Sequence, residues 1–431
     1  MSNIELDKAY QLISDTNQSI FLTGRAGTGK STFLRKIRNE IDKRFVVLAP
    51  TGIAAINVKG MTIHSFFQFP LRPLLPNDKE IKTFKKNSEK RQLIEKMDVL
   101  VIDEISMVRA DLLDGIDTAL RRNTGNAKIP FGGKQLILIG DLFQLEPVAP
   151  VRTGAYDIIF RNYDNAFFFS AYAFKAVDFI GIELKKVYRQ EDESFISLLD
   201  SVRKMDVDEE ELALINNRFD PNISLDDHRF TITLAAINRA VDKVNKAQLA
   251  RLHSKQIVYH GKVIGDFSPD RFPAEIDLRL KEGAQVIFVK NDTEKRWVNG
   301  SIGRINTLDE EFIEVELGTG RIVFVEPVAW ENIVFKYDKA EKKIVEEVKG
   351  TYTQYPLRLA WSITIHKSQG MTFDDIIIDL GRGAFAGGQT YVALSRCRTL
   401  EGIRLKTPIR YKDIFIDPAV IEFAKTLDNN K

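Results

Sequence analysis

The sequence predicts an α/β protein with two parallel-sheet units and a small antiparallel barrel inserted into the second unit. Short apolar runs recur along the chain, each followed by a turn and a longer helical or mixed segment, as in buried parallel sheets with helical crossovers. Between 284 and 356 the pattern changes to alternating apolar and polar residues, which is typical of antiparallel strands. The length of 431 residues leaves room for two to three domains.

The first unit is expected over residues 1–178. Its predicted strands are IFLTG (20–24), FVVLAP (45–50), VLVID (99–103) and QLILIG (135–140). A proline-bearing, irregular stretch interrupts this unit, and it cannot belong to a central strand. We expect it to form a small insertion at about 64–97.

The second unit is expected over 179–283 and 357–431. Its predicted strands are FTITLAA (230–236), FDDIIIDLG (373–381) and GIRLK (402–406). The intervening segment, 284–356, contains the alternating runs IEVEL and RIVFVEPV around the turn Gly318-Thr-Gly320, and these predict the inserted barrel.

Composition narrows the possible functions. The chain has 62 basic and 60 acidic residues, a formal net charge of +2, so any nucleic-acid binding must come from a local groove. Cys397 is the single cysteine, which excludes a disulfide framework and a cysteine zinc site. No stretch approaches the roughly 18 apolar residues of a membrane span, and acidic residues stand where a secretory signal would be apolar. We therefore expect a cytoplasmic protein without membrane contact.

A phosphate-binding loop is the strongest local signal. GRAGTGKS (24–31) fits the pattern G-x-x-x-x-G-K-[ST] between a predicted strand and the helical run TFLRKIRNEI. Its backbone N–H groups can surround phosphate, the Lys30 ammonium can reach the β and γ phosphates, and the Ser31 hydroxyl can hold Mg²⁺. The predicted ligands are ATP and Mg²⁺, and the candidate nucleotide-binding residues are Gly24, Ala26, Gly27, Thr28, Gly29, Lys30, Ser31 and Thr32.

Polar side chains follow two further strands of the first unit. Asp103 and Glu104 end VLVIDE, at the carboxyl edge where ligands of open α/β sheets bind. Asp103 would hold Mg²⁺ through its water shell, and Glu104 would polarise the attacking water. Gln144, after the strand QLILIG, has the reach to contact the γ-phosphate or its water. An adjacent Asp and Glu are common on surfaces, so the assignment depends on the phosphate loop.

Seven segments follow one another along the chain: GRAGTGKS, APTGIAAINVKGMTIHSFF (49–67), VIDEISM, GDLFQLEPV, VYRQ (187–190), ITIHKSQGMTFD (363–374) and YVALSRCRTL (391–400). In this order they resemble the helicase motifs of the PIF family of superfamily 1B DNA helicases, and the resemblance extends from about 24 to 400. The stretch from 104 to 122 also resembles the one that separates this family from RecD-type helicases.

The resemblance implies two RecA-like domains with ATP between them, single-stranded DNA across their tops and 5′ to 3′ translocation. The expected activity is ATP-driven unwinding of duplex or forked DNA in genome maintenance, with G-quadruplexes and DNA–RNA hybrids as further candidate substrates. The inserted barrel resembles the SH3-like domain of this branch. A monomer is expected, located in the cytoplasm with the bacterial nucleoid, or in the nucleus of a eukaryote.

The resemblance also implies residue roles in the second unit. Arg189 and Arg396 become arginine fingers, and hydrolysis does need positive charge on the transition-state oxygens. Gly370 is assigned to the nucleotide site. The glutamine that usually reads adenine is missing, because LDKAY with Asp7 stands near its place; Gln18 is taken as the candidate, with Gln11 as an alternative.

DNA contacts are expected on both units. Small hydroxyl residues and backbone N–H groups bind phosphate without reading sequence, whereas His and Phe rings stack on bases. The candidates are Pro50, Thr51, Gly52, Thr62, His64, Ser65 and Phe66 in the first unit, and Asn238, Thr364, His366, Lys367 and Ser368 in the second. Core packing is the alternative interpretation for His64 and Phe66. Leu71, Pro73 and Leu74 are candidates for a wedge that splits the duplex.

Two other functions fit parts of the pattern. A nucleotide-switched protein that binds or remodels single-stranded DNA could use the same loop without unwinding. An ATP-dependent nuclease is a weaker alternative, because Pro269-Asp270 lacks an acidic-x-Lys partner. DNA-stimulated hydrolysis together with strand displacement would separate the helicase from both.

Overall fold

The computed structural model describes residues 3–75, 78–147, 155–223 and 230–428. Its first unit is a six-stranded parallel sheet with the strand order β3-β2-β4-β5-β1-β6. The strands are β1 Ile20–Gly24, β2 Phe45–Ala49, β3 Met61–Thr62, β4 Val99–Ile102, β5 Gln135–Ile139 and β6 Ile180–Leu184. The helices around it are α1 Ile4–Asp15, α2 Lys30–Glu40, α3 Gly52–Asn57, α4 Ile63–Phe67, α5 Glu89–Lys96, α6 Ala110–Thr124, α7 Ala155–Asn162 and α8 Tyr172–Lys175.

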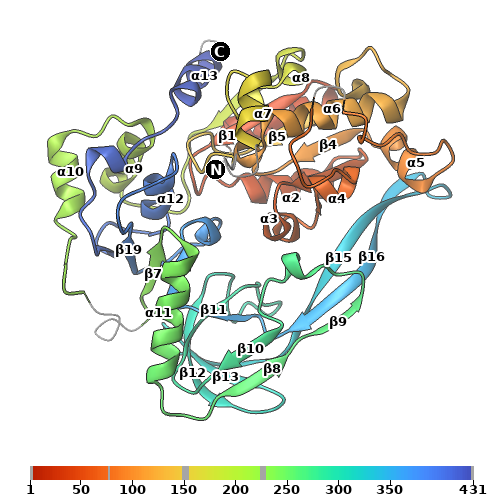
Figure 1. Cartoon of the computed structure of the whole chain (residues 1–431). Coiled ribbons are helices and arrows are strands. Elements are labelled where there is room, and N and C mark those ends of the chain that lie inside the picture. The colour runs from red at the N-terminus through yellow and green to blue at the C-terminus, as the bar shows by residue number, and fades with distance from the viewer. Residues whose placement is uncertain (1–2, 76–77, 148–154, 224–229, 429–431) are drawn as a thin grey trace.

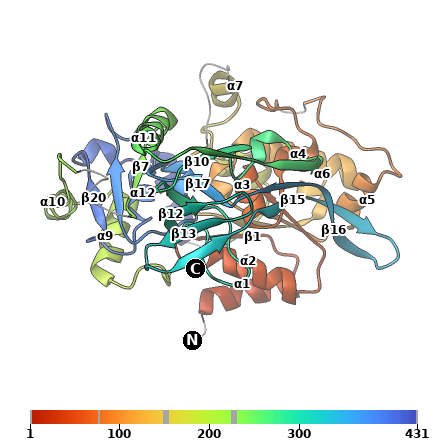
Figure 2. The ribbon, with the colours of Figure 1, turned by 90° about the horizontal axis from the view of Figure 1, so that it is seen from below.

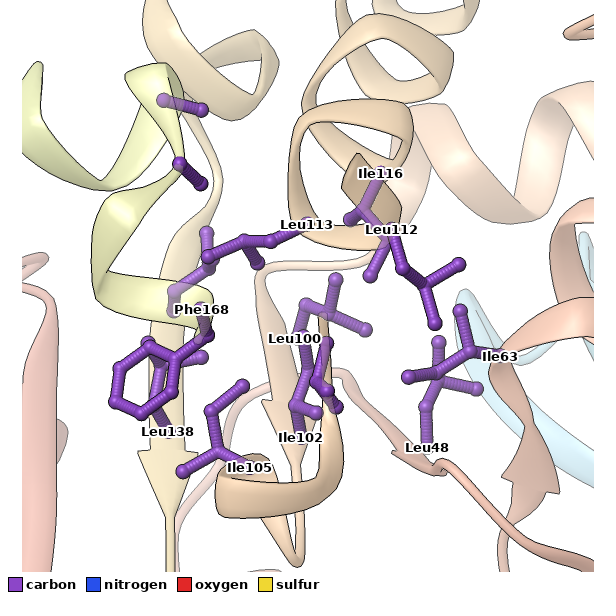
Figure 3. Close-up of a cluster of buried hydrophobic side chains, with 14 of the residues drawn as sticks. Leu48, Ile63, Leu100, Ile102, Ile105, Leu112, Leu113, Ile116, Leu138 and Phe168 are labelled. Carbon is purple, nitrogen blue, oxygen red and sulfur yellow. The ribbon is translucent and has the colours of Figure 1, made fainter. Parts of the chain in front are cut away.

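Successive side chains of these strands enter two separate cores. On β4, Leu100 and Ile102 pack with Leu113 of α6 and with Phe168 (Figure 3), whereas Val99 and Val101 face the core under α1 and α2. Adjacent residues of a strand point to opposite faces, and both faces of this sheet are covered by helices. This explains why the strands are apolar throughout instead of alternating, and the predicted parallel sheet is confirmed.

The second unit contains a smaller parallel sheet with the order β18-β7-β19-β20. Its strands are β7 Ile232–Ala235, β18 Ser362–Thr364, β19 Ile376–Asp379 and β20 Ile403–Leu405. Its helices are α9 Glu193–Lys204, α10 Glu209–Asn216, α11 Asn238–Arg251 and α12 Gln389–Leu394, and the last helix of the chain is α13 Pro418–Asp428. No helix in the described part of the chain is long and apolar enough to cross a membrane.

Antiparallel strands form the lower part of the molecule (Figure 1). A five-stranded sheet has the order β14-β13-β12-β11-β17, and β10 pairs with β8. The strands are β8 Ile257–His260, β10 Asp277–Leu280, β11 Gln285–Phe288, β12 Ile302–Leu308, β13 Ile313–Leu317, β14 Ile322–Val325 and β17 Leu357–Leu359. Tyr259 and Leu278 share one core with Val286 and Val315. The antiparallel part therefore begins before the expected residue 284, because β8 and β10 are too short for their alternation to be noticed.

A long hairpin extends from the antiparallel part to the first unit. It consists of β15 Val328–Asp338 and β16 Lys343–Gln354, with β9 Lys262–Gly265 beside β16. Its far end lies against α5 in both views (Figures 1 and 2). There Phe335 enters the core of the first unit, and Lys336 forms a 2.8 Å ion pair with Glu89. The hairpin thus connects the inserted part to the first unit directly.

Two boundaries differ from those expected. Strand β6 pairs along its whole length with β1, so the first sheet continues past residue 178. Helix α13 also returns to the first unit, where the Phe423 ring stacks on Phe169 with centroids 4.3 Å apart. The sequence of α13 predicts an apolar face but does not indicate which unit that face covers, and the packing in the structure shows that it is the first unit.

Candidate nucleotide and DNA site

The phosphate loop connects β1 to α2, as its sequence predicts. Gly29 caps α2 with φ of +88° and Gly27 has φ of +82°, both in the left-handed region that glycine tolerates. The Lys30 Nζ donates to the carbonyl oxygens of Gly24 at 2.7 Å and Arg25 at 2.9 Å. The loop is therefore closed around the lysine ammonium, at the N-terminus of a helix whose first N–H groups suit an anion.

A cleft of about 420 Å³ opens at this loop, between the two units. Residues from both units line it, and they include every predicted catalytic residue. The lining residues are Ala26, Gly27, Thr28, Gly29, Lys30, Ser31, Thr32, Glu104, Gln144, Tyr188, Arg189, Gly370, Thr372, Arg396 and Arg398. The sequence did not predict that Tyr188, Thr372 and Arg398 line the cleft. For Tyr188 the available signal was its position next to Arg189.

Two carboxylates directly follow β4: Asp103 is buried, and Glu104 is half-buried. Burial and the neighbouring Glu104 charge raise the pKa of Asp103 to about 7, and burial also raises the pKa of Glu104. Glu104 has φ of +51°, a left-handed conformation that costs energy for a side chain of its size. Strained backbone is common at active sites, where it aims a side chain, and Glu104 is the carboxylate that reaches the cleft.

The second unit contributes two arginines. Arg396 follows α12 and is almost fully buried; burial and the nearby Arg189 charge lower its pKa to about 9. Its Nε donates to Val392 O at 2.9 Å, and Arg189 Nη1 donates to Ser395 O at 3.2 Å. Both guanidiniums are thus held by the same short segment.

The arginine segment also contacts the phosphate loop directly. Tyr188 N donates to Gly27 O at 2.9 Å, and a Cβ added at Gly27 would lie 2.5 Å from the Arg189 Cβ. Only glycine fits at this crossing. The two units therefore meet closely at the phosphate loop.

The candidate adenine reader, Gln18, is wrongly placed for that role. It precedes β1, at the opposite end of the strand from Gly24, and its amide donates to Asp178 O. Asn3, which precedes α1, instead contacts a residue of the cleft, because its Nδ2 donates to the Tyr188 hydroxyl at 3.4 Å. The order of residues could not show this, because the contact joins positions that are 185 residues apart.

The DNA candidates of the first unit lie at the carboxyl edge of β2 and β3. Thr51 caps α3 and Thr62 caps α4 with their side-chain oxygens. Arg271 approaches from the second unit: its Nη2 donates to the Thr62 hydroxyl at 3.2 Å, and its side chain packs over Gly52. A basic side chain thus covers part of this edge in the structure.

One aromatic candidate of the first unit is corrected by the structure. Phe66 is fully buried, packs edge-on against Phe67 at 4.8 Å, and has the Lys90 Nζ 3.4 Å above its ring. Its ring cannot stack on a base, because the single turn of α4 directs positions 63, 66 and 67 into the core. His64 is half-buried and Ser65 partly exposed. Leu71 is 91% exposed, whereas Leu74 is buried, so the proposed wedge could use only the former.

The candidates of the second unit divide in the same way. Asn238, His366 and Lys367 have exposed or half-exposed side chains, at the start of α11 and in the turn after β18. Ser368 is buried and its hydroxyl donates to Ile365 O at 2.7 Å, so it braces this turn and cannot contact DNA. Thr364 is also buried and accepts from Lys367 N.

The fold and the cleft define a nucleotide hydrolase with a phosphate-binding loop on one parallel-sheet unit and arginines on another. A family model described as PIF1-like helicase matches residues 3–211. The ATP-dependent DNA helicase Pif1 of Bdellovibrio bacteriovorus is 32% identical, over 96% of this chain and 89% of that protein. The chain therefore belongs to the PIF1-like helicase family of enzymes.

Two solved structures of Pif1 from a Bacteroides species agree, each at 39% identity. The complex with ADP-AlF4 matches with a TM-score of 0.91, over 99% of this chain and 96% of that one. The complex with single-stranded DNA matches with a TM-score of 0.71, over 100% of this chain and 98% of that one. The unliganded Bacteroides Pif1 structure matches equally well, with a TM-score of 0.90, so the domain arrangement seen here is closer to that of these two structures than to that of the DNA complex.

Proposed function

We propose that this chain is an ATP-driven helicase that moves 5′ to 3′ along single-stranded DNA and unwinds duplex or forked DNA. One observation supports this most strongly. Lys30, Glu104 and Gln144 from the first unit share a cleft with Arg189 and Arg396 from the second. Because hydrolysis needs residues of both units, each ATP can be linked to a movement between them.

The cleft supplies the parts of a phosphoryl-transfer site. Glu104 and Gln144 orient a water that attacks the γ-phosphorus, and the water proton passes to the Glu104 carboxylate. The bond from the γ-phosphorus to the bridging oxygen breaks, and its electrons leave with ADP. Lys30, Arg189 and Arg396 stabilise the charge on the phosphoryl oxygens, and a finger of this kind contributes about 10³ to 10⁵ in rate.

The proposed function also needs residues that bind Mg²⁺ and the adenine ring. Ser31 and Asp103 would hold Mg²⁺, a cation that proteins bind through few side chains and the substrate phosphates, and it would neutralise phosphate charge. The described residues contain no group of three His, Cys, Asp or Glu side chains that would form a closed metal cage. The adenine would lie against the Tyr188 ring near Asn3.

The DNA path runs across the carboxyl edges of both sheets. Thr51, Thr62 and His64 on one unit, with Asn238 and Lys367 on the other, provide hydroxyl, ring and ammonium groups. Such groups bind the backbone and base faces without reading sequence, so affinity would fall with salt and depend little on sequence. The chain would act where its DNA lies, in a nucleoid or a nucleus.

An unwinding assay with 5′-tailed and 3′-tailed duplexes of equal length tests the proposal. We expect ATP-dependent displacement of the 5′-tailed substrate alone, and none with Lys30→Ala, which removes the countercharge of the phosphates. DNA-stimulated hydrolysis without displacement would instead identify a nucleotide-switched binding protein. Shortened labelled strands would identify a nuclease, and displacement of the 3′-tailed duplex would reverse the direction.

A further inference from the structure

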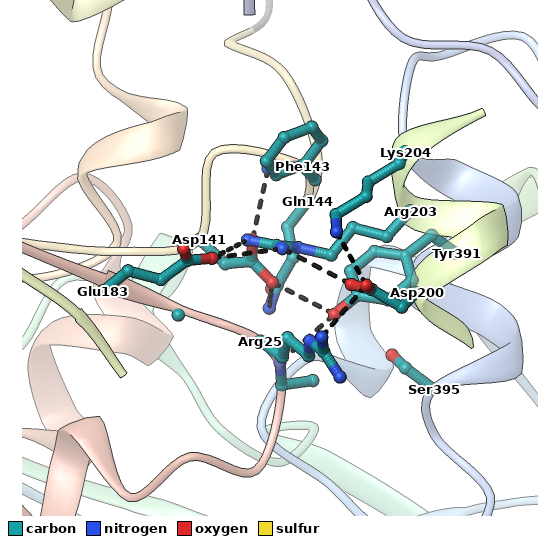
Figure 4. Close-up of polar contacts among 12 residues, drawn as sticks. Arg25, Asp141, Phe143, Gln144, Glu183, Asp200, Arg203, Lys204, Tyr391 and Ser395 are labelled. Atoms are coloured by element: carbon teal, nitrogen blue, oxygen red, sulfur yellow. Dashed lines mark hydrogen bonds and ion pairs between the residues drawn. The ribbon is translucent and has the colours of Figure 1, made fainter. Parts of the chain in front are cut away.

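Arg203, on α9 of the second unit, is buried against the first unit behind the cleft. It is 3% exposed, and its Nε lies 3.4 Å from Asp141 Oδ1 of the first unit. Its guanidinium also stacks 4.2 Å above the Phe143 ring (Figure 4). Arg203 does not line the cleft, so any effect on hydrolysis must pass through the residues that it contacts.

Asp141 connects this arginine to the catalytic residues. Its Oδ2 accepts from the Gln144 amide at 3.2 Å and from the Tyr391 hydroxyl at 3.2 Å. The Tyr391 oxygen in turn accepts from Ala26 N of the phosphate loop at 3.2 Å. One carboxylate therefore restrains both the glutamine that faces the γ-phosphate position and the tyrosine bound to the phosphate loop.

The same helix also contacts the phosphate loop directly. Asp200, one turn before Arg203, forms a 3.0 Å ion pair with Arg25 and a 2.8 Å pair with Lys204. Arg203 Nη1 lies 3.4 Å from Glu183 and 3.7 Å from Asp200 (Figure 4). These contacts join charged groups of both units, and they are complete only while the units stay together.

The central pair is buried while the units are together. Asp141 is 1% exposed and Arg203 is 3% exposed, so truncating one side chain leaves the other charge buried without this partner. An isolated pair of this kind is weak evidence for stability, but it fixes geometry well when further hydrogen bonds satisfy both groups. Here those further bonds lead to Gln144 and to the phosphate loop.

We propose that Arg203 is a positioning residue for ATP hydrolysis, which acts by holding Asp141 and thereby fixing Gln144 in the cleft. The inference rests on the proposed function, since it assumes hydrolysis at this cleft. Because Arg203 belongs to the second unit, its contact with Asp141, and through Asp141 its effect on Gln144, exists only while the units are together. A misplacement of about 1 Å can cost roughly 10²-fold in rate, so a residue behind the site can control turnover.

The test measures DNA-stimulated ATP hydrolysis by the full chain with a single-stranded oligonucleotide. For Arg203→Ala we expect kcat to fall by about 10- to 100-fold, while KM for ATP and the Kd for DNA stay within about threefold. Arg203→Lys should give an intermediate kcat, because one ammonium keeps the charge but cannot span Asp141 and Glu183. Arg218→Ala is the matched control: this arginine also belongs to the second unit and donates to the Ile403 carbonyl at 2.9 Å, but it does not line the cleft.

A double-mutant cycle separates positioning from mere support of the fold. If Arg203 acts through Gln144, adding Arg203→Ala to Gln144→Ala should lower kcat less than threefold further. The inference is overturned if the losses of kcat in the two single variants multiply in the double variant. It is also overturned if Arg203→Ala leaves kcat unchanged or changes KM alone. If Arg203→Ala does not fold, Arg203→Lys is the test, and a kcat equal to that of the unaltered chain overturns the inference.

The proposed function can fail separately. If the unaltered chain shows DNA-stimulated hydrolysis without strand displacement, the proposed helicase activity is wrong. The same variants still test the role of Arg203 in hydrolysis. Absence of ATP turnover in the unaltered chain would overturn both.

Discussion

Individual residues in the cleft combine opposite charges with deep burial. Burial lowers the pKa of Lys30, whereas the nearby Asp141 and Glu104 charges act on it in the opposite direction. The same lysine lowers the pKa of Glu104, against the larger effect of burial. The pKa of each group therefore depends on the others, and removing one group alters the pKa values of the rest.

Replacing Glu104 with glutamine should separate nucleotide binding from hydrolysis. The amide keeps the shape of the side chain but cannot accept the water proton, so we expect Mg-ATP to bind while turnover falls by about 10² or more. Nucleotide titration and steady-state hydrolysis on one preparation check this. Turnover near that of the unaltered chain would place the base elsewhere.

His64 and Phe66 should respond differently to truncation, although they are neighbours in sequence. Phe66→Ala creates a cavity in the core and should cost about 3–5 kcal/mol of unfolding free energy, with little effect on DNA affinity. His64→Ala should weaken DNA binding by about 1–3 kcal/mol if its ring stacks on a base. Melting curves and DNA titrations on both variants check the pair; the reverse pattern would contradict it.

At the scale of elements, α5 is the support for the long hairpin. Phe335 of β15 enters the core that α5 covers, and Lys90 of α5 lies over the buried Phe66 ring. Burial lowers the pKa of Lys90 to about 7. An ammonium over an aromatic face is favourable, but the Lys90 ammonium loses hydration when it is buried there.

Lys90→Met should stabilise the protein more at low pH than at high pH. The folded pKa of about 7 lies below the unfolded value of 10.5, so the burial cost is complete below pH 7 and disappears as pH rises toward 10.5. We therefore expect a larger rise in Tm from Lys90→Met at pH 6 than at pH 9. The exposed Lys86→Met is the control. Equal changes at both pH values would show that the cation–π contact compensates for burial.

At the scale of the whole molecule, the two units meet at several places, two of which lie at the proposed ATP and DNA sites. At the cleft, the segment with Tyr188 and Arg189 touches the phosphate loop. At the DNA face, Arg271 of the second unit bonds Thr62 of the first. The Bacteroides Pif1 complex with single-stranded DNA matches this arrangement less well than the unliganded structure and the ADP-AlF4 complex do. We expect the Arg271 contact to break when DNA occupies this edge.

Arg396→Ala tests whether closure of the units completes the catalytic site. Its guanidinium reaches the cleft from the second unit, so hydrolysis should fall by about 10³ to 10⁵ while binding of single-stranded DNA is retained. Unwinding should fall in parallel. Because Arg396 also braces the end of α12, the variant must keep its Tm for the result to count. Hydrolysis within a few-fold of the unaltered chain would remove it from catalysis.

Local patterns were sufficient to predict the parallel sheets, the phosphate loop and the acidic strand end. These features depend on residues close in sequence. A short apolar run favours a buried strand whatever its partners are, and the glycines at 24, 27 and 29 allow the loop conformation through their own backbone freedom. The order of the motifs extended this to Arg189 and Arg396, which do line the cleft.

Only the tertiary structure decided which side chains face outward and which distant segments meet. Phe66 and Ser368 belong to motifs that suggest DNA contact, yet packing directs both inward. Helix α13 and the Arg203–Asp141 pair join segments far apart along the chain. Burial and pairing of this kind depend on the whole core, because a short apolar or charged segment is compatible with several partners until packing selects one.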